Sequence, residues 1–286
     1  MPDIPEQEIK DSSYLIIRHA YSIHNFREKE LHLIHGDNSE EYKQLRRNKD
    51  LYDVELHQLG LLQAQSNQDT INKVNFKKVF VSPLRRTIQT TIELFKSHSN
   101  KQNIQFTILP IIREILDSSN DIAMNVSDLI ELYSPQQERC KGLKFDFSLL
   151  QESFVDPNLW QVYTLYNDEK TELLIHEIRS NNQPDNQINK QTIKDHKDII
   201  LKKLIETNHK FEYHSDMYQR AKTIKQFFKT YLDQNPLNHE TQEKYGIVAH
   251  SRIIMVLTSD GVDEKDNLIN PQSFKNCEMR AFNKFS

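Results

Sequence analysis

Four short apolar segments separated by helix-like stretches most constrain the fold of this chain. They lie at residues 14–17, 78–81, 106–109 and 245–249, and the pattern predicts buried strands. Apolar residues three or four positions apart predict helices over residues 59–71, 83–95 and 217–231. Alternating strands and helices favour a three-layer α/β/α fold with a mainly parallel central sheet.

The third and fourth predicted strands are far apart in the sequence. Roughly 130 residues separate them, where a crossover needs about a dozen. We therefore predict one domain over residues 1–286, with a mostly helical insert at roughly 118–240 that covers a site. Residues 181–189 are rich in Asn and Gln and predict an exposed loop. Trp160, Tyr163 and Tyr166 either line a pocket in this insert or, as their spacing favours, belong to the core.

Glycine is scarce, with 5 residues in 286. No two of them are closer than 15 positions, the distance from Gly246 to Gly261. This spacing excludes a glycine-rich dinucleotide loop and a nucleotide P-loop, both of which cradle phosphate with closely spaced glycines. A phosphate site in this chain must therefore be built largely from side chains.

Charge and cysteine content narrow the function further. The net charge of -4 and the lack of a dominant basic run argue against nucleic-acid binding. Short apolar runs and a polar, acidic N-terminus predict a cytoplasmic protein without a membrane segment. Cys140 and Cys277 predict free thiols, as expected in a reducing compartment. Neither begins the cysteine-phosphatase pattern, because Asp146 and Asn283 stand where that pattern needs arginine.

Each predicted strand is followed by side chains that carry chemistry. Ligands of open α/β sheets bind beyond the carboxyl ends of the strands, so we expect these side chains to converge. Each of them alone is more often structural, and the prediction rests on the joint pattern. The residues are Arg18, His19, Arg86, Glu114 and His250. Together they predict an anion pocket with a nucleophile and a proton donor.

Ser82 and Pro83 follow the second predicted strand and resemble a helix N-cap and first helical residue. This arrangement would place Arg86 in the first turn of the helix, near its positive end.

Five segments in the same order resemble the histidine phosphatase superfamily, also called the phosphoglycerate mutase-like family. Arg-His-Ala-Tyr-Ser-Ile-His-Asn at residues 18–25 is similar to the family's Arg-His-Gly-x-Ser-x-x-Asn. Residues 56–64 resemble its Leu-Thr-x-x-Gly-x-x-Gln-Ala segment, and residues 82–90 its Ser-x-Leu-x-Arg-x-x-Gln-Thr segment. Residues 113–114 and 248–250 match its acid and its second histidine. The tail at residues 276–280 resembles a eukaryotic branch of the family.

The resemblance implies a phosphomonoester phosphatase that needs no metal or other cofactor. His19 would form a phosphohistidine, and Glu114 would protonate the leaving oxygen and later activate water. Arg18, Arg86 and a protonated His250 would balance the charge on the phosphoryl oxygens. The expected partner is a small phosphorylated substrate or a phosphoprotein.

Additional phosphate contacts are expected from Ser22, Asn25 and Ser251. The remaining histidines near the first motif lack carboxylates at a metal-ligand spacing and are interpreted as a solvated helix face. These histidines are His24, His32 and His35.

Two positions depart from the family pattern, Ala20 and Ser251, where the family has glycine. Glycine at such points permits close approach of the backbone or unusual φ angles, whereas Ala20 suits an ordinary conformation. These departures motivate an alternative, a catalytically impaired pseudophosphatase that binds a phosphorylated partner. A phosphomutase is less favoured, because residues 26–35 lack the Trp-rich sequence of the mutases.

Overall fold

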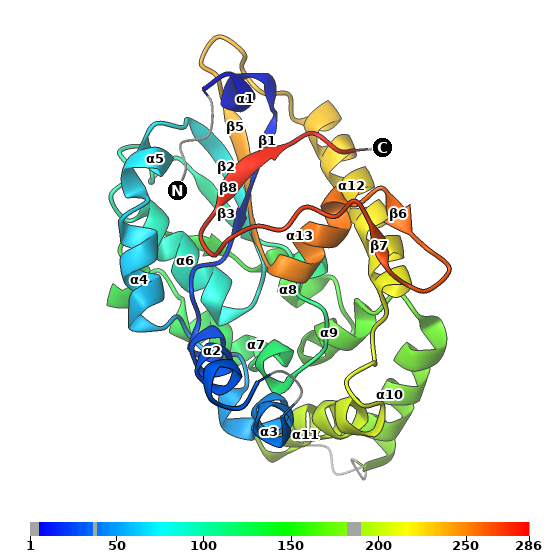
Figure 1. Cartoon of the computed structure of the whole chain (residues 1–286). Coiled ribbons are helices and arrows are strands. Elements are labelled where there is room, and N and C mark those ends of the chain that lie inside the picture. Colours follow the sequence, from blue (N-terminus) through cyan, green and yellow to red (C-terminus); the bar gives the residue numbers. More distant parts are fainter. Residues whose placement is uncertain (1–5, 37–38, 182–189, 286) are drawn as a thin grey trace.

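A six-stranded sheet forms the centre of the protein (Figure 1). The computed structural model describes residues 6–36, 39–181 and 190–285, and the strand order is β4-β3-β2-β5-β1-β8. The first five strands in chain order pair in parallel, and β8 pairs antiparallel with β1. The strands are β1 (Tyr14–Arg18), β2 (Phe76–Val81), β3 (Gln105–Ile108), β4 (Phe145–Asp146), β5 (Lys244–Ala249) and β8 (Met279–Phe282). The predicted α/β fold with a mainly parallel sheet is confirmed, and β4 and β8 are unpredicted edge strands.

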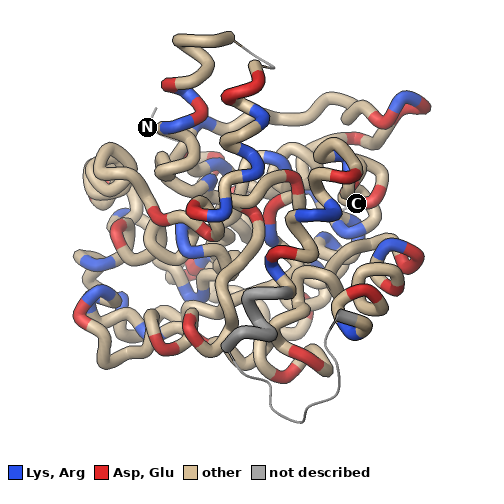
Figure 2. The backbone as a smooth tube through the Cα atoms, turned by 90° about the horizontal axis from the view of Figure 1, so that it is seen from below, with Lys and Arg blue, Asp and Glu red and all other residues tan. Residues whose placement is uncertain are grey.

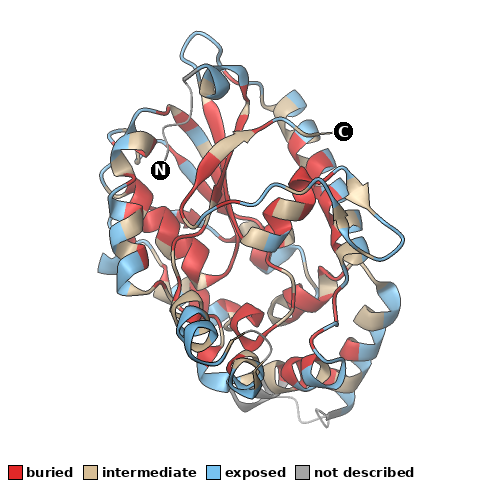
Figure 3. Cartoon of the chain, viewed as in Figure 1, coloured by how far each residue is buried: buried red, intermediate tan, exposed pale blue. Residues whose placement is uncertain are grey.

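Helices cover both faces of the sheet, because successive strand residues point to opposite sides. Leu15 and Ile17 pack with the helices of one face, and Tyr14 and Ile16 with those of the other. The first layer contains α4 (Gln58–Gln65), α5 (Gln68–Asn72) and α6 (Arg85–Phe95), and the second α12 (His214–Gln234) and α13 (Ser251–Thr258). Figure 3 shows the strands buried between these layers.

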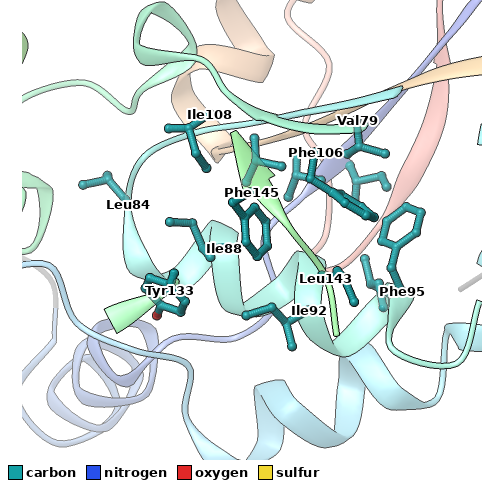
Figure 4. Packing of buried hydrophobic residues seen from close by; sticks show 14 of the residues in the cluster. Val79, Leu84, Ile88, Ile92, Phe95, Phe106, Ile108, Tyr133, Leu143 and Phe145 are labelled. Carbon is teal, nitrogen blue, oxygen red and sulfur yellow. The ribbon is translucent and has the colours of Figure 1, made fainter. Parts of the chain in front are cut away.

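The packing of α6 on the sheet shows how one face is held (Figure 4). Ile88, Ile92 and Phe95 extend from α6 toward Phe106 of β3 and Val79 of β2. The rings of Phe95 and Phe106 are 5.3 Å apart in an edge-to-face arrangement. Each such buried side chain contributes about 1.5–3 kcal/mol, so this face anchors the start of α6 beside the strand ends.

Two predicted helices begin or end differently in the structure. The helix predicted over residues 59–71 is two helices, α4 and α5. At the break between them, Asn67 Nδ2 donates to the Gln63 carbonyl (2.6 Å). The predicted N-cap at Ser82 is wrong, since α6 begins at Arg85, whose amide donates to Asp53 Oδ1 (2.8 Å). Ser82 is instead hydrogen-bonded to His250. The helix predicted at residues 217–231 lies within α12.

The stretch at residues 118–240 is mostly helical but is not separate from the sheet, since it also supplies β4 and α12. Its other helices are α7 (Val126–Leu132), α8 (Ser148–Glu152), α9 (Trp160–Tyr163), α10 (Asp168–Asn181) and α11 (Lys190–Glu206). Helices α9, α10 and α11 share an apolar cluster beyond the carboxyl ends of the strands (Figure 1). A buried Arg113–Glu212 pair (2.8 Å) joins this region to the segment after β3. The predicted loop at 181–189 falls on residues 182–189, outside the described residues.

Shorter elements complete the fold. They are the helices α1 (Glu6–Asp11), α2 (Ile23–His35) and α3 (Glu40–Arg47), the strands β6 (Gly261–Val262) and β7 (Leu268–Ile269), and the 3-10 helices η1 (Lys49–Leu51), η2 (Pro110–Ile112), η3 (Ser119–Asp121), η4 (Glu138–Cys140) and η5 (Pro157–Leu159). Both cysteines are free, as predicted, and the structure shows that both are buried. None of the described helices is long and apolar enough to cross a membrane.

Candidate active site

Four of the five strand-end residues line one cavity of about 220 Å³ at the carboxyl edge of the sheet. They are Arg18, His19, Arg86 and Glu114. The predicted phosphate contacts Ser22, Asn25 and Ser251 line the same cavity. It is bounded by α2, the start of α13 and the segment after β3, so topology brings together residues far apart in the sequence.

His19 is a buried, neutral imidazole. Burial first, and then Arg86 and Arg18, hold its pKa well below the usual range. Its Nδ1 lies 2.7 Å from the Ala20 carbonyl, which can only accept, so Nδ1 carries the proton. The Nε2 atom therefore keeps the lone pair that a nucleophile requires.

His250 lies beside His19 because β1 and β5 are neighbours, with Arg18 paired to Ala249. The two imidazole rings are 5.2 Å apart. Burial and Arg86 hold the pKa of His250 well below the usual range, which favours a neutral ring in this structure. The protonated state expected beside a phosphoryl group stays a prediction. Arg86 Nε donates to His250 Nδ1 (3.2 Å), and Nε2 then donates to Ser82 Oγ (2.7 Å). His250 is fully buried and orients Arg86 from behind.

Glu114 is also buried, and its carboxylate lies against the start of α13. Its Oε1 accepts from the amides of Ile115 (2.9 Å) and Ile253 (3.2 Å), and its Oε2 accepts from the Arg252 amide (3.1 Å). Burial, followed by the nearby Asp121 carboxylate, raises the pKa of Glu114. With a single acceptor bond, Oε2 keeps a lone-pair direction at which a proton can be held.

Asn25 is oriented to donate. Its Oδ1 accepts from the Ser22 amide (3.2 Å), the Ser22 hydroxyl (3.1 Å) and Asn276 Nδ2 (3.4 Å). These bonds leave the Asn25 Nδ2 group for an anion in the cavity. The Ser22 hydroxyl also caps α2 by accepting from the Asn25 amide (3.2 Å), so Ser22 serves the position of Asn25.

The C-terminal segment supports the first motif from the other side. The Cys277 amide donates to the carbonyls of Arg18 (3.1 Å) and His19 (3.2 Å). Asn276 Nδ2 donates to the His19 carbonyl (3.2 Å), and Arg18 Nη1 donates to the Phe274 carbonyl (2.5 Å). These bonds fix the backbone that carries the two catalytic candidates.

Gly60 lets α4 approach the loop that follows His19. A Cβ at this position would lie 2.0 Å from the Tyr21 carbonyl oxygen. The same carbonyl accepts from the His57 amide (3.0 Å), and the Tyr21 amide donates to Gln63 Oε1 (3.1 Å). The start of α4 is thus bound directly to the loop of the first motif.

The two departures from the family's glycines fit their surroundings. Ala20 is fully buried and is not among the described residues with positive φ, so it has the ordinary conformation that was expected for it. Its amide donates to Thr90 Oγ1 (2.9 Å). Ser251 is the first residue of α13 and places a hydroxyl at the cavity wall.

Sequence reasoning missed several cavity residues, among them His24, Asn120 and Asp121. His24 is 7 % exposed, so its assignment to a solvated helix face is wrong, whereas His32 and His35 are exposed as predicted. His24, in the first turn of α2, and Asp121 line the same cavity. The sequence signal for Asn120 and Asp121 was the polar run at residues 117–121, shortly after Glu114.

Positive and negative side chains alternate at the mouth of the cavity. Arg46 pairs with Asp117, and the Tyr42 hydroxyl donates to Glu28 (3.0 Å). Viewed from the side of the strand ends, Figure 2 shows basic and acidic residues interspersed.

A separate cavity of about 660 Å³, lined by Tyr163 and Tyr166, contains none of the predicted site residues. Trp160 belongs to the core.

The sequence model described as "Histidine phosphatase superfamily (branch 1)" matches residues 34–121. The match covers less than half of the chain, and it shows a resemblance of this segment to the superfamily. The matched segment contains Gly60, Arg86 and Glu114, and the sheet brings His19 and His250, which lie outside the match, to the same place. No curated protein matches the chain.

Solved structures resemble the chain at low sequence identity. The ecdysone phosphate phosphatase from Bombix mori, in complex with tungstate, is 11% identical with a TM-score of 0.44, and the alignment covers 93% of this chain and 86% of that one. A mycobacterial glucosyl-3-phosphoglycerate phosphatase is 13% identical with a TM-score of 0.38, covering 85% and 76%. A putative alpha-ribazole-5'-P phosphatase from Escherichia coli is 13% identical with a TM-score of 0.34, covering 93% and 98%.

Proposed function

We propose that this protein is a member of the histidine phosphatase superfamily, and that it is a metal-independent phosphomonoester phosphatase that works through a phosphohistidine on His19. The observation that carries the proposal is the bond from His19 Nδ1 to the Ala20 carbonyl. It leaves Nε2 as the nucleophilic nitrogen of a buried imidazole in a cavity that also holds Arg18, Arg86 and Glu114.

In the first half-reaction, the lone pair of His19 Nε2 attacks phosphorus, and the bond from phosphorus to the leaving oxygen breaks on the opposite side. Glu114, whose pKa is raised, gives its proton to that oxygen, and an alcohol leaves. Two guanidinium groups, Arg18 and Arg86, stabilise the charge on the three remaining oxygens, so no metal is required. Asn25 Nδ2 and the Ser251 hydroxyl add neutral donors.

In the second half-reaction, water attacks the phosphohistidine. The Glu114 carboxylate takes one proton from the water, the bond between phosphorus and Nε2 breaks, and inorganic phosphate leaves. Both His19 and protonated Glu114 are then restored. We assign His250 and Ser22 to positioning, because His250 holds Arg86 and Ser22 holds Asn25.

The test is hydrolysis of 4-nitrophenyl phosphate in the presence of EDTA. We expect turnover by the wild-type protein and a loss of about a thousandfold or more in His19→Ala. The matched control is His32→Ala, an exposed histidine of the adjoining helix α2, which should retain the wild-type rate. Equal rates in His19→Ala and the wild type would refute the assignment of the nucleophile.

One observation favours the alternative of a pseudophosphatase that binds a phosphorylated partner. Arg86 is already paired with Asp121 (2.9 Å), which reduces the positive charge that it offers to a substrate. Phosphate binding without hydrolysis of any phosphomonoester would support this alternative.

A further inference from the structure

The Arg86 guanidinium is almost completely occupied by the protein itself. Its Nε donates to His250, and Nη1 donates to the Asn120 carbonyl (2.9 Å) and to Asn120 Oδ1 (3.3 Å). Its Nη2 donates to Asp121 Oδ1 (2.9 Å). An arginine has five N–H groups, so a single Nη2 hydrogen is left for a phosphoryl oxygen.

The Asp121 carboxylate is a fixed part of the cavity wall. Its Oδ2 accepts from the backbone amide (3.1 Å) and the hydroxyl (3.0 Å) of Ser118, and Asn120 Nδ2 donates to Oδ1 (3.2 Å). Gln161 Nε2 donates to the Asp121 carbonyl (2.6 Å). The aspartate is therefore held in place independently of Arg86.

A carboxylate at this position acts against a bound phosphate in two ways. It takes an Arg86 N–H that a bidentate contact to the phosphoryl group would use. It also places a negative charge, 6 % exposed and poorly screened, beside the site of a second negative charge. Arg86 keeps two other anchors, His250 and Asn120, so its orientation does not depend on Asp121 alone.

We infer that Asp121 limits the phosphate affinity of the site by occupying Arg86 in place of a phosphoryl oxygen. This inference rests on the proposed phosphate site but not on turnover. Asp121 thereby weakens retention of the anion, including the phosphate that hydrolysis releases.

The test measures binding of inorganic phosphate to the full-length protein by calorimetry at pH 7.5. Asp121→Asn keeps an oxygen for Arg86 but removes the charge, and Asp121→Ala removes the competing acceptor as well. Both should bind phosphate at least about tenfold more tightly than the wild type, since one charge contact is worth more than 1.4 kcal/mol at this depth. Circular dichroism and thermal unfolding identify which variants are folded.

The matched control is Asp117→Asn, a carboxylate of the same segment that lines the cavity but pairs with Arg46. It should change the phosphate Kd by less than about threefold, because it makes no contact with Arg86. An equal gain in Asp117→Asn and Asp121→Asn would overturn direct competition for Arg86.

Weaker binding in folded Asp121→Asn and Asp121→Ala would also overturn the inference and make Asp121 an anchor of Arg86. Turnover measured on the same samples separates the two proposals. Tighter phosphate binding without any hydrolysis supports the role of Asp121 and counts against the phosphatase. Hydrolysis that depends on His19, together with weaker phosphate binding in both variants, supports the phosphatase and counts against the role of Asp121. Absence of phosphate binding in every protein contradicts the inference.

Discussion

Replacing Gly60 by alanine tests the contact between α4 and the loop after His19. The new Cβ would lie 2.0 Å from the Tyr21 carbonyl oxygen and 2.8 Å from its carbon. Both atoms belong to the backbone and cannot rotate away. Ordinary contact begins at 3.4 Å, so the helix and the loop must separate by roughly 1.4 Å.

The expected loss is larger for activity than for stability. Overpacking costs about 1–3 kcal/mol, and the better helix propensity of alanine returns about 1 kcal/mol, so the net loss of stability is about 0–2 kcal/mol. A displacement of about 1 Å in a catalytic arrangement lowers the rate about a hundredfold. Because Tyr21 precedes Ser22 and Asn25, we expect kcat/KM of Gly60→Ala to fall about a hundredfold.

The assay compares kcat/KM for 4-nitrophenyl phosphate with the free energy of unfolding in urea. Gly261→Ala is the matched control, since its Cβ would lie 3.6 Å from Ile269 Cδ1, an ordinary contact. It should keep wild-type activity and stability within about 0.5 kcal/mol. A kcat/KM of Gly60→Ala within threefold of the wild type would refute the reasoning.

Three further predictions follow from buried groups. Glu114→Gln should lower kcat/KM about 10²–10⁴-fold for an alkyl phosphate. The loss should be much smaller for 4-nitrophenyl phosphate, because its leaving group needs no proton. Equal losses for the two substrates would contradict the role of Glu114 as an acid. Because the pKa of Glu114 is raised and the acid must be protonated, wild-type kcat/KM for the alkyl phosphate should fall as pH rises through that pKa, a decline that Glu114→Gln should lack. Glu212→Ala leaves Arg113 and Arg220 buried without their carboxylate and should cost about 3–5 kcal/mol in urea unfolding, whereas an unchanged midpoint would show that the pair is dispensable.

The catalytic candidates were predictable because topology alone brings them together. In a parallel sheet, residues after adjacent strands meet at one edge, which places His19 beside His250 whatever the details of packing. Arg86 reaches the cavity although its helix begins two residues later than Pro83, the predicted first helical residue, because it still lies in the first turn.

Other features depend on contacts that a linear pattern does not contain. Arg86 donates to Nδ1 of His250, so Nδ1 carries no proton in this arrangement. Which nitrogen faces Arg86 is set by packing. The position of Asp121 depends on a turn that is held by Gln161 of α9, a helix that lies far from Asp121 in the sequence. His24 belongs to the motif that resembles the family, but its burial beside the cavity depends on tertiary packing that a helix pattern does not contain.

The most direct test of the central claim is to trap the phosphoenzyme. Protein incubated briefly with a ³²P-labelled phosphomonoester and quenched in alkali should carry label that is stable in base and lost in acid, the behaviour of a phosphohistidine. We expect the label in the wild type and in His32→Ala, and none in His19→Ala. Label of the same amount in His19→Ala, or hydrolysis by the wild type with no trapped label at any quench time, would contradict the account.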